Sequence, residues 1–492
     1  MTKSVSPLSM LLFLIGGIVA LLGTYWDDAW HTDRGRDSFT IPPHLLLYGG
    51  VLLVGIAIAL WAVMVFRREK RIRPVLSYPP LALALIGDAV TLAAAPIDNA
   101  WHLAFGRDAV LWSPPHLLGV AGILAVGSSM LLAVSQSSGR RGYIVTVAVA
   151  ALVLCVSLVP VMEYEADVPQ FAAAWYLPVL TAGSIFSFAL LRTVSPQQGW
   201  TATVTAILYT GFRTGIILFL LLLGFSFPFV PPIIVPALLF DLTVKARLPR
   251  VLHAAIYALA VYVSYVPYLN ILLNGVYVTF TDVMIGLPLA LMASWLVLEL
   301  VEAPRLQVRR IPTALVLLGC SLLLFSGPVL AHDPGQGNEI GKMQLTATLQ
   351  NSTTTFTAKV LDMRECDQLE PKTLQARRAG EVVTAPLHRV GVCQFQGAVL
   401  LPERGRWFVY AELVYSGRGV ETWLPVIARE THAQFEKLAS LYEVETQSGS
   451  PIEVFSSILL YTLTFALLGS ILRVFRRQSS HMEPLTRAVL PQ

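Results

Sequence analysis

The chain has 492 residues, of which 55% are hydrophobic and 13% charged, and its net charge is +4. So apolar a composition excludes a soluble enzyme of this length and predicts a protein that crosses the membrane many times. The Lys and Arg residues are spread over short loops, which favours a role in membrane topology and argues against a nucleic-acid-binding face.

Apolar runs of roughly 17–25 residues predict about twelve membrane-spanning helices. Lys and Arg cluster in alternate loops, so the positive-inside rule places both termini in the cytoplasm. We therefore expect a multi-pass protein of the cell membrane, surrounded by the lipid bilayer. The predicted spans are residues 7–26, 45–66, 79–97, 115–135, 143–162, 172–192, 202–225, 229–244, 251–269, 281–300, 312–331 and 453–473.

Three domains follow from this pattern: a transmembrane helical domain at 1–331, an external domain at 332–452, and a last helix with a cytoplasmic tail at 453–492. Runs rich in Thr, Val, Tyr and Trp, separated by Gly and Ser, predict a small antiparallel β-sandwich for the external domain. Cys366 and Cys393 lie there in an oxidising compartment, so we expect a disulfide between them rather than two buried thiols. The predicted fold class is thus an all-α polytopic membrane protein with an external β-sandwich.

A polar loop after the first span recurs after the third. Residues 27–44 read DDAWHTDRGRDSFTIPPH, and residues 98–116 read DNAWHLAFGRDAVLWSPPH. The match extends into the flanking apolar runs, so the repeat consists of whole helix–loop–helix units at 14–52 and 85–124. A shared scaffold explains the apolar parts, but it does not explain why both loops keep Asp, His, Arg-Asp and His in one order. Both loops, predicted to lie on the outer side, are therefore candidate functional sites.

The first loop offers a set of metal ligands. Asp27 and His31 are four residues apart, so they share a face if the first helix continues past the membrane surface. A carboxylate at the negative C-terminal end of a helix is disfavoured unless a cation accompanies it. With His44 these side chains make a three-ligand set with open positions, and ligand types alone do not choose between zinc, non-haem iron and copper. The second loop offers Asp98, His102 and His116 in the same roles.

Each loop also carries an Arg-Asp pair, Arg36-Asp37 and Arg107-Asp108. These side chains either orient the imidazoles or close the loops as ion pairs. A single histidine at a membrane surface usually only hydrogen-bonds a backbone carbonyl. Here four of the nine histidines fall in two copies of one spacing, which favours a metal site.

The arrangement Asp27-x3-His31-x4-Arg36-Asp37-x4-Pro42-x-His44, with Trp30 before the first histidine, resembles the metal-site segment of the C subunit of the copper membrane monooxygenases. That family comprises the particulate methane and ammonia monooxygenases. The resemblance implies copper at Asp27, His31 and His44, and an enzyme that oxidises a small apolar substrate with oxygen. Because that family is a multi-subunit assembly, the resemblance also implies an oligomer. If the chain is an enzyme, its electrons have to come from a quinol or a partner protein, because the sequence carries no visible redox relay. The second copy has one residue more between its histidines.

The residues before the external domain leave two alternatives. The pattern consists of Arg309-Arg310, an apolar run and a small residue before His332. It indicates either a cleavable internal signal sequence or an uncut eleventh span followed by a polar linker. If the chain is cut, His332 becomes an amino-terminal histidine that can bind copper through its amine and imidazole. That would resemble the external copper subunit of the same monooxygenases.

Several ionisable residues lie in or near the spans. Asp88 and Arg213 are expected either to form an ion pair that holds helices together or to serve a proton path. The acidic run at 163–167 is expected either to be a solvated loop or, on the metal side, to add a ligand or receive protons.

Three functions are compatible with these features. The first is a copper-dependent, monooxygenase-like oxidoreductase acting on a small apolar substrate with oxygen. The second is a copper uptake or delivery protein whose external domain receives the metal. The third is a structural membrane component whose Asp and His side chains bind zinc or nothing.

Overall fold

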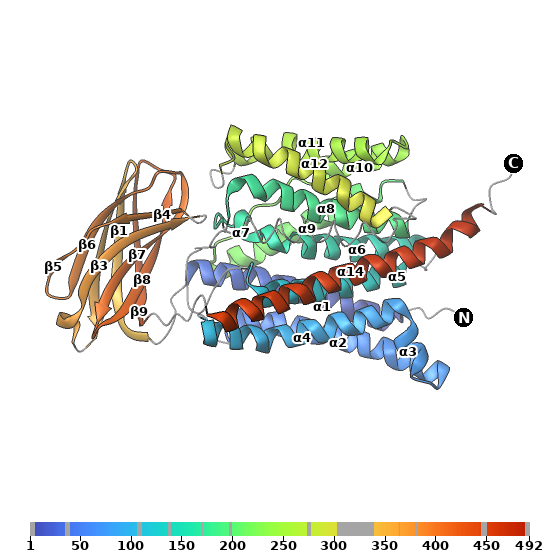
Figure 1. Ribbon diagram of the computed structural model, residues 1–492, viewed down its shortest axis with the longest axis horizontal. Coiled ribbons are helices and arrows are strands. Elements are labelled where there is room, and N and C mark those ends of the chain that lie inside the picture. The colour runs from blue at the N-terminus through green and yellow to red at the C-terminus, as the bar shows by residue number, and fades with distance from the viewer. Residues whose placement is uncertain are drawn as a thin grey trace.

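In the computed structural model, a bundle of helices carries a β domain at one end (Figure 1). The structure describes residues 5–34, 40–105, 111–135, 139–169, 171–195, 199–272, 277–302, 339–363, 365–378, 381–443 and 450–487, without the side chains of 102–103, 272 and 478–487. The predicted span at 312–331 lies outside this part of the chain.

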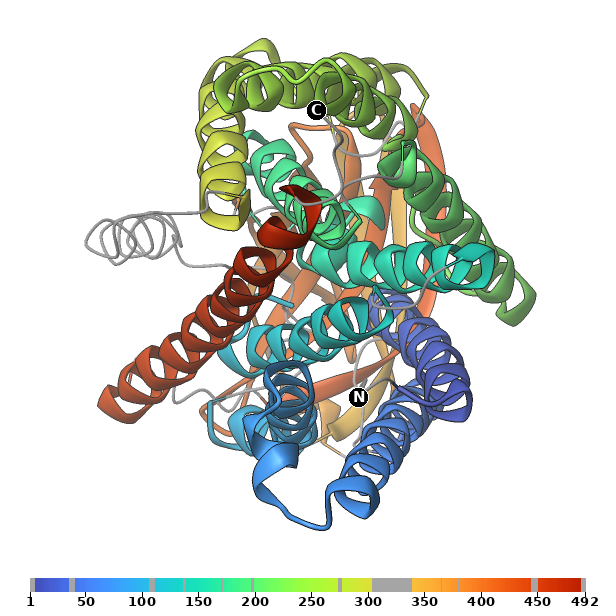
Figure 2. The same ribbon diagram turned by 90° about the vertical axis from the view of Figure 1, so that its right-hand side faces the viewer.

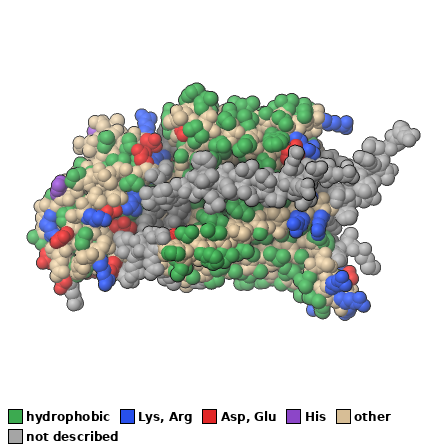
Figure 3. All heavy atoms as spheres, viewed as in Figure 1, with side chains coloured by type: hydrophobic (Ala, Val, Ile, Leu, Met, Phe, Trp, Pro, Cys, Tyr) green, Lys and Arg blue, Asp and Glu red, His purple; other side chains and the backbone are tan. Residues whose placement is uncertain are grey.

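Ten helices in the described ranges are long and apolar enough to cross a membrane, which fits a multi-pass membrane protein. Hydrophobic side chains cover the bundle, and Lys and Arg collect at the end away from the β domain (Figure 3). The helices are α1 (Pro7–Asp33), α2 (Pro42–Glu69), α3 (Arg73–Ser77), α4 (Pro79–Phe105), α5 (Pro114–Val134), α6 (Gly139–Leu158), α7 (Met162–Glu165), α8 (Ala173–Val194), α9 (Thr201–Leu223), α10 (Ile234–Lys245), α11 (Arg250–Pro267), α12 (Phe280–Glu302) and α14 (Pro451–Arg487).

The prediction of a continuous span at 229–244 is wrong. Residues 225–233 form no helix, and only the 12-residue helix α10 follows. Pro228, Pro231 and Pro232 disfavour a helix in the first half of this segment. At 1.5 Å per residue, α10 covers about 18 Å, which is short of the roughly 30 Å of a hydrocarbon core.

The repeat forms two similar helix pairs, α1 with α2 and α4 with α5. Their crossings use equivalent glycines: a Cβ atom on Gly16 would lie 2.8 Å from Gly50 O, and one on Gly87 would lie 2.7 Å from Gly122 O. Only Gly permits backbones to approach this closely, as is usual between helices in a membrane. Figure 2 shows these pairs from the end opposite the β domain.

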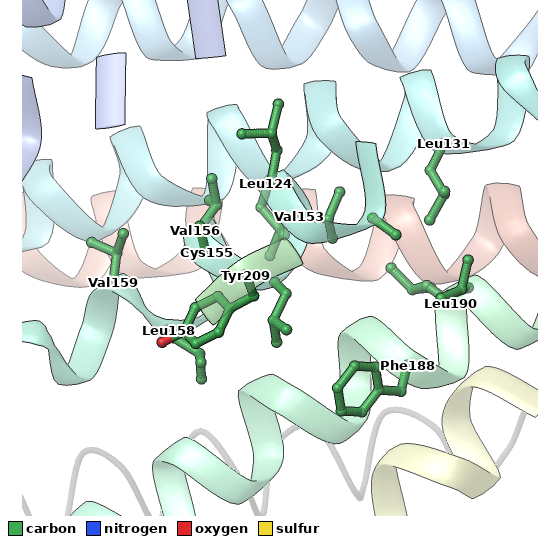
Figure 4. Close-up of a cluster of buried hydrophobic side chains, with 14 of the residues drawn as sticks. Leu124, Leu131, Val153, Cys155, Val156, Leu158, Val159, Phe188, Leu190 and Tyr209 are labelled. Atoms are coloured by element: carbon green, nitrogen blue, oxygen red, sulfur yellow. The ribbon is translucent and has the colours of Figure 1, made fainter. Parts of the chain in front are cut away.

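The core of the bundle forms where α5, α6, α8 and α9 meet (Figure 4). Leu124, Leu158, Phe188 and Tyr209 are buried there together with Cys155, a free thiol. Because lipid tails are as apolar as these side chains, such a core stabilises by close packing more than by removal from water.

The β domain is one curled antiparallel sheet with the strand order β4-β3-β7-β8-β9-β1-β2-β6-β5. The two ends of this order approach each other, since β3 contacts β5 and β6, and β4 contacts β6. The prediction of a sandwich is therefore corrected to a nearly closed, barrel-like sheet around one apolar core. The strands are β1 (Glu339–Gln350), β2 (Thr353–Asp362), β3 (Glu370–Arg378), β4 (Glu381–Ala385), β5 (Leu387–Gly391), β6 (Gln394–Leu400), β7 (Gly405–Tyr415), β8 (Arg418–Ala428) and β9 (His432–Glu443).

The predicted disulfide is confirmed. Cys366 and Cys393 are bonded, and their Cα atoms lie 5.4 Å apart. The bond links the turn before β3 to the turn between β5 and β6, so it closes the side of the sheet where the strand order ends.

Candidate metal site

The ends of α1 and α2 bring the three ligands of the first loop together. Helix α1 continues without a break to Asp33, so Asp27 and His31 stand one turn apart on it, as predicted. Pro42 and Pro43 are the first two residues of α2, a position where the missing N–H of proline costs nothing. His44 therefore enters from the first turn of α2.

The three side chains converge on one point. Asp27 Oδ1 lies 3.1 Å from His44 Nε2 and 3.7 Å from His31 Nε2. One ligand atom from each residue can be chosen so that all three lie within 4.8 Å of one another. These are separations that a single metal ion can bridge, with metal–ligand bonds of roughly 2 Å.

The surroundings of this triad favour a cation. The side chains are 14–21% exposed, which leaves an approach from the end of the bundle. Asp27 lies in the last two turns of α1, where the helix dipole is negative. A positive ion between Asp27 and the two imidazoles would offset both the carboxylate and the dipole.

The second loop repeats part of this geometry. Asp98 Oδ1 lies 3.2 Å from His116 Nε2, which matches the Asp27–His44 distance in the first copy. His102 stands on α4 four residues after Asp98, but its side chain lies outside the described part of the chain. Arg36, Asp37, Arg107, Asp108 and His332 also lie outside the described residues.

The end of α1 is held in place by contacts that sequence reasoning missed. The Asp33 carboxylate accepts hydrogen bonds from Ser226 N at 2.6 Å and Ser226 Oγ at 2.5 Å. Arg406 of β7 lies 3.7 Å from the same carboxylate, so the β domain touches the helix that carries Asp27 and His31. Trp30, about one turn before Asp33 on the helix, stacks on Phe225, the neighbour of Ser226.

The acidic run at 163–167 is buried, and the prediction of a solvated loop is wrong. Glu163 Oε1 accepts from Leu111 N in the second loop, at 3.2 Å. Glu165 Oε2 lies 2.6 Å from Arg213 Nη1 of α9. The third carboxylate, Asp167, pairs with Arg378 and Arg429 of the β domain at 3.2 and 3.0 Å. One short segment thus joins the second loop, the bundle and the β domain.

The ion pair proposed between Asp88 and Arg213 does not form, because Arg213 pairs with Glu165. Arg213 also donates to Tyr25 Oη and to Phe229 O. Phe229 N in turn donates to Glu165 O at 2.9 Å. These two bonds satisfy the backbone C=O and N–H of Phe229 within the non-helical segment 225–233, where no helix supplies partners.

Asp88 instead lines a cavity between the two helix pairs. The cavity has a volume of about 70 Å³ and a mostly apolar wall. The residues that line it include Thr24, three residues before Asp27 on α1. Equivalent positions of the two repeats line it, in the pairs Gly17/Asp88, Ala20/Thr91, Val51/Ile123 and Val54/Val126.

Comparison with known proteins finds no family model, no curated protein and no solved structure that matches this chain.

Proposed function

We propose that this protein is a copper-binding membrane oxidoreductase, similar to the copper monooxygenases, that acts on a small apolar substrate with oxygen. The observation that carries the proposal is the convergence of Asp27, His31 and His44 at the end of α1 and α2. Two imidazoles and one carboxylate suit copper, and the resemblance of this loop to the copper-binding segment of those enzymes selects it over zinc or iron.

Copper held by these side chains would supply oxygen binding and one-electron redox chemistry. The chain itself fixes the ligands: helix α1 sets the spacing of Asp27 and His31, and the Pro-Pro start of α2 aims His44. Asp33, bonded to Ser226, keeps the end of α1 from moving. Electrons would come from a quinol or a partner protein, which the proposal leaves as an external component.

The cavity beside the site supports a small apolar substrate. It begins about one helical turn before Asp27 on α1 and is lined mainly by Val, Leu, Ile, Ala and Gly residues. A dry, apolar pocket next to a redox metal is the usual arrangement for holding such a substrate away from water.

The test compares metal content in two double variants. Elemental analysis of purified His31→Ala/His44→Ala protein should show a loss of most bound copper, while His102→Ala/His116→Ala should lose less. Ligands must converge within a few tenths of an ångström, and the second copy has one residue more between its histidines. The exposed β-domain residue His388 provides a control, since His388→Ala should keep the full copper content.

Two further results would decide against the proposal. If neither double variant changes the copper content, the loops are not the metal sites. If copper is bound at Asp27, His31 and His44 but no oxygen is consumed with any quinol or reductant, and cellular copper changes with expression, the protein handles copper and does not use it in catalysis.

A further inference from the structure

The carboxyl group of Asp88 has no hydrogen-bond or ion-pair partner among the residues that the structure describes. It lies near the middle of α4 and faces Gly55 of α2, where a Cβ atom would come within 3.2 Å of Asp88 Oδ2. An ionisable side chain at this depth is costly, so it normally pairs with another group or serves a ligand. The neighbouring space in this case is the cavity between the two helix pairs.

The other polar groups of the cavity wall cannot act as donors to a ligand. Thr24 Oγ1 donates to Ala20 O, and Thr91 Oγ1 donates to Gly87 O, both at 2.9 Å. Each hydroxyl oxygen keeps its lone pairs, and a carboxyl group accepts hydrogen bonds in either protonation state. The polar part of the wall therefore offers acceptors, while the rest is apolar.

The volume limits what can enter. A dry cavity of about 150 Å³ holds benzene, with six carbon atoms, so about 70 Å³ holds a molecule of roughly three non-hydrogen atoms. Such a ligand would place an alkyl group against the Val and Leu side chains and a donor group on the carboxylate.

We propose that the cavity between α1/α2 and α4/α5 binds a short primary alcohol or amine, with its O–H or N–H donated to Asp88. This inference rests on the proposed function and narrows its substrate from a wholly apolar molecule to a short alkyl chain with one donor group. Such a ligand is a substrate only if the metal site beside the cavity is catalytic. Asp88 would select for a donor group, and the apolar wall would select for length.

Binding of three probes of equal size tests the proposal. Ethanol, ethylamine and propane each have three non-hydrogen atoms, and only the first two carry a donor. Saturation-transfer NMR on the full protein in nanodiscs of deuterated lipid should show that wild type binds ethanol about tenfold more tightly than propane, which is the factor expected for one hydrogen bond. Ethylamine is an ammonium ion at neutral pH, so its hydrogen bond to the carboxylate is charge-assisted and its preference over propane should be at least as large. 1-Butanol should bind less tightly than ethanol because it exceeds the cavity.

Substitutions distinguish the effect of the Asp88 carboxyl group on binding from the effect of the cavity volume. Asp88→Leu should abolish the preference for the donor probes while propane still binds, and Asp88→Asn, which keeps an acceptor oxygen, should retain part of it. Val120→Phe should fill the cavity and remove all binding. The proposal is overturned if wild type binds propane as tightly as the donor probes, if it binds none of them, or if Asp88→Leu leaves the preference unchanged.

Copper content is measured in the same samples and keeps this test distinct from that of the proposed function. Asp88 is not a metal ligand, so Asp88→Leu protein should hold as much copper as wild type. A donor preference in protein that lacks copper would support the cavity site and count against the oxidoreductase. Bound copper without any donor preference would support the copper site and count against the cavity site.

Discussion

Glu165 and Arg213 form an ion pair in which neither side chain has any solvent exposure, with Glu165 Oε2 2.6 Å from Arg213 Nη1. Arg213 joins this carboxylate to Tyr25 of α1 and to Phe229 in the non-helical segment after α9. Because Tyr25 precedes Asp27 by two residues, the pair supports the helix that carries the candidate metal ligands. The ion pair therefore stabilises the helix that positions Asp27 and His31.

Removing one member of this pair should be strongly destabilising. Arg213→Met leaves Glu165 as an uncompensated buried charge, which typically costs about 3–5 kcal/mol. The double variant Arg213→Met/Glu165→Leu removes both charges and should recover most of that loss. Denaturant titration of the purified protein measures both values. A double variant no more stable than Arg213→Met alone would contradict this account.

The convergence of Asp27, His31 and His44 was predictable from the sequence because its geometry is local. Asp27 and His31 depend only on continuation of one helix, and the place of His44 depends on the preference of proline for the first helical turn. The partner of Arg213 was not predictable, because hydropathy identifies a buried charge but carries no information on which distant carboxylate reaches it. Asp88 was the obvious candidate by depth, and Glu165 is the actual one.

The close crossing of α1 and α2 should be sensitive to a single methyl group. A Cβ atom on Gly50 would lie 2.3 Å from Ala20 N and 2.7 Å from Gly16 O, whereas one on Gly49 meets nothing within 4 Å. Gly50→Ala should therefore cost about 1–3 kcal/mol through overpacking. It should also lower copper affinity, because the two helices hold Asp27 and His44 together.

Gly49→Ala is the matched control and should be neutral or stabilising by up to about 1 kcal/mol. Equal effects of the two variants would refute the packing argument.

The two errors in the predicted fold have physical causes. Hydropathy counted 229–244 as a span, although its prolines favour extended backbone that other side chains must then satisfy. The β domain was expected to be a sandwich because alternating polarity identifies strands but not the order in which they pair. Closure into a barrel-like sheet depends on contacts between β3 and β5 or β6, which the pattern within one strand does not encode.

The disulfide between Cys366 and Cys393 should contribute measurably to the β domain. It closes a loop with a sequence separation of 27, for which chain entropy predicts about 3–4 kcal/mol. Cys366→Ser/Cys393→Ser protein should therefore exchange the amide hydrogens of β5 and β6 faster than wild type. Reducing agent should produce the same acceleration in wild type and none in the double variant. Unchanged exchange after reduction would show that packing alone holds this side of the sheet.

Stability of the β domain should fall as pH rises through the range in which Glu421 ionises. Glu421 of β8 is 4% exposed and lies opposite Glu412 of β7 in the sheet register. Burial is the largest cause that raises the pKa of Glu421 to about 7; Arg377 lowers it, and the Glu412 carboxylate raises it further. The folded state therefore holds this proton more tightly than the unfolded chain, whose glutamate has a pKa of about 4.3. The resulting stabilisation is complete below about pH 4 and is lost as pH rises to 7 and above.

Glu421→Gln should raise stability at pH 8 and flatten its decline between pH 4 and 8, as measured by amide exchange of β7 and β8 in the intact protein. The exposed Glu430 gives the control, because Glu430→Gln should leave the decline unchanged. A Glu421→Gln variant with the same pH profile as wild type would show that the carboxyl group titrates alike in both states.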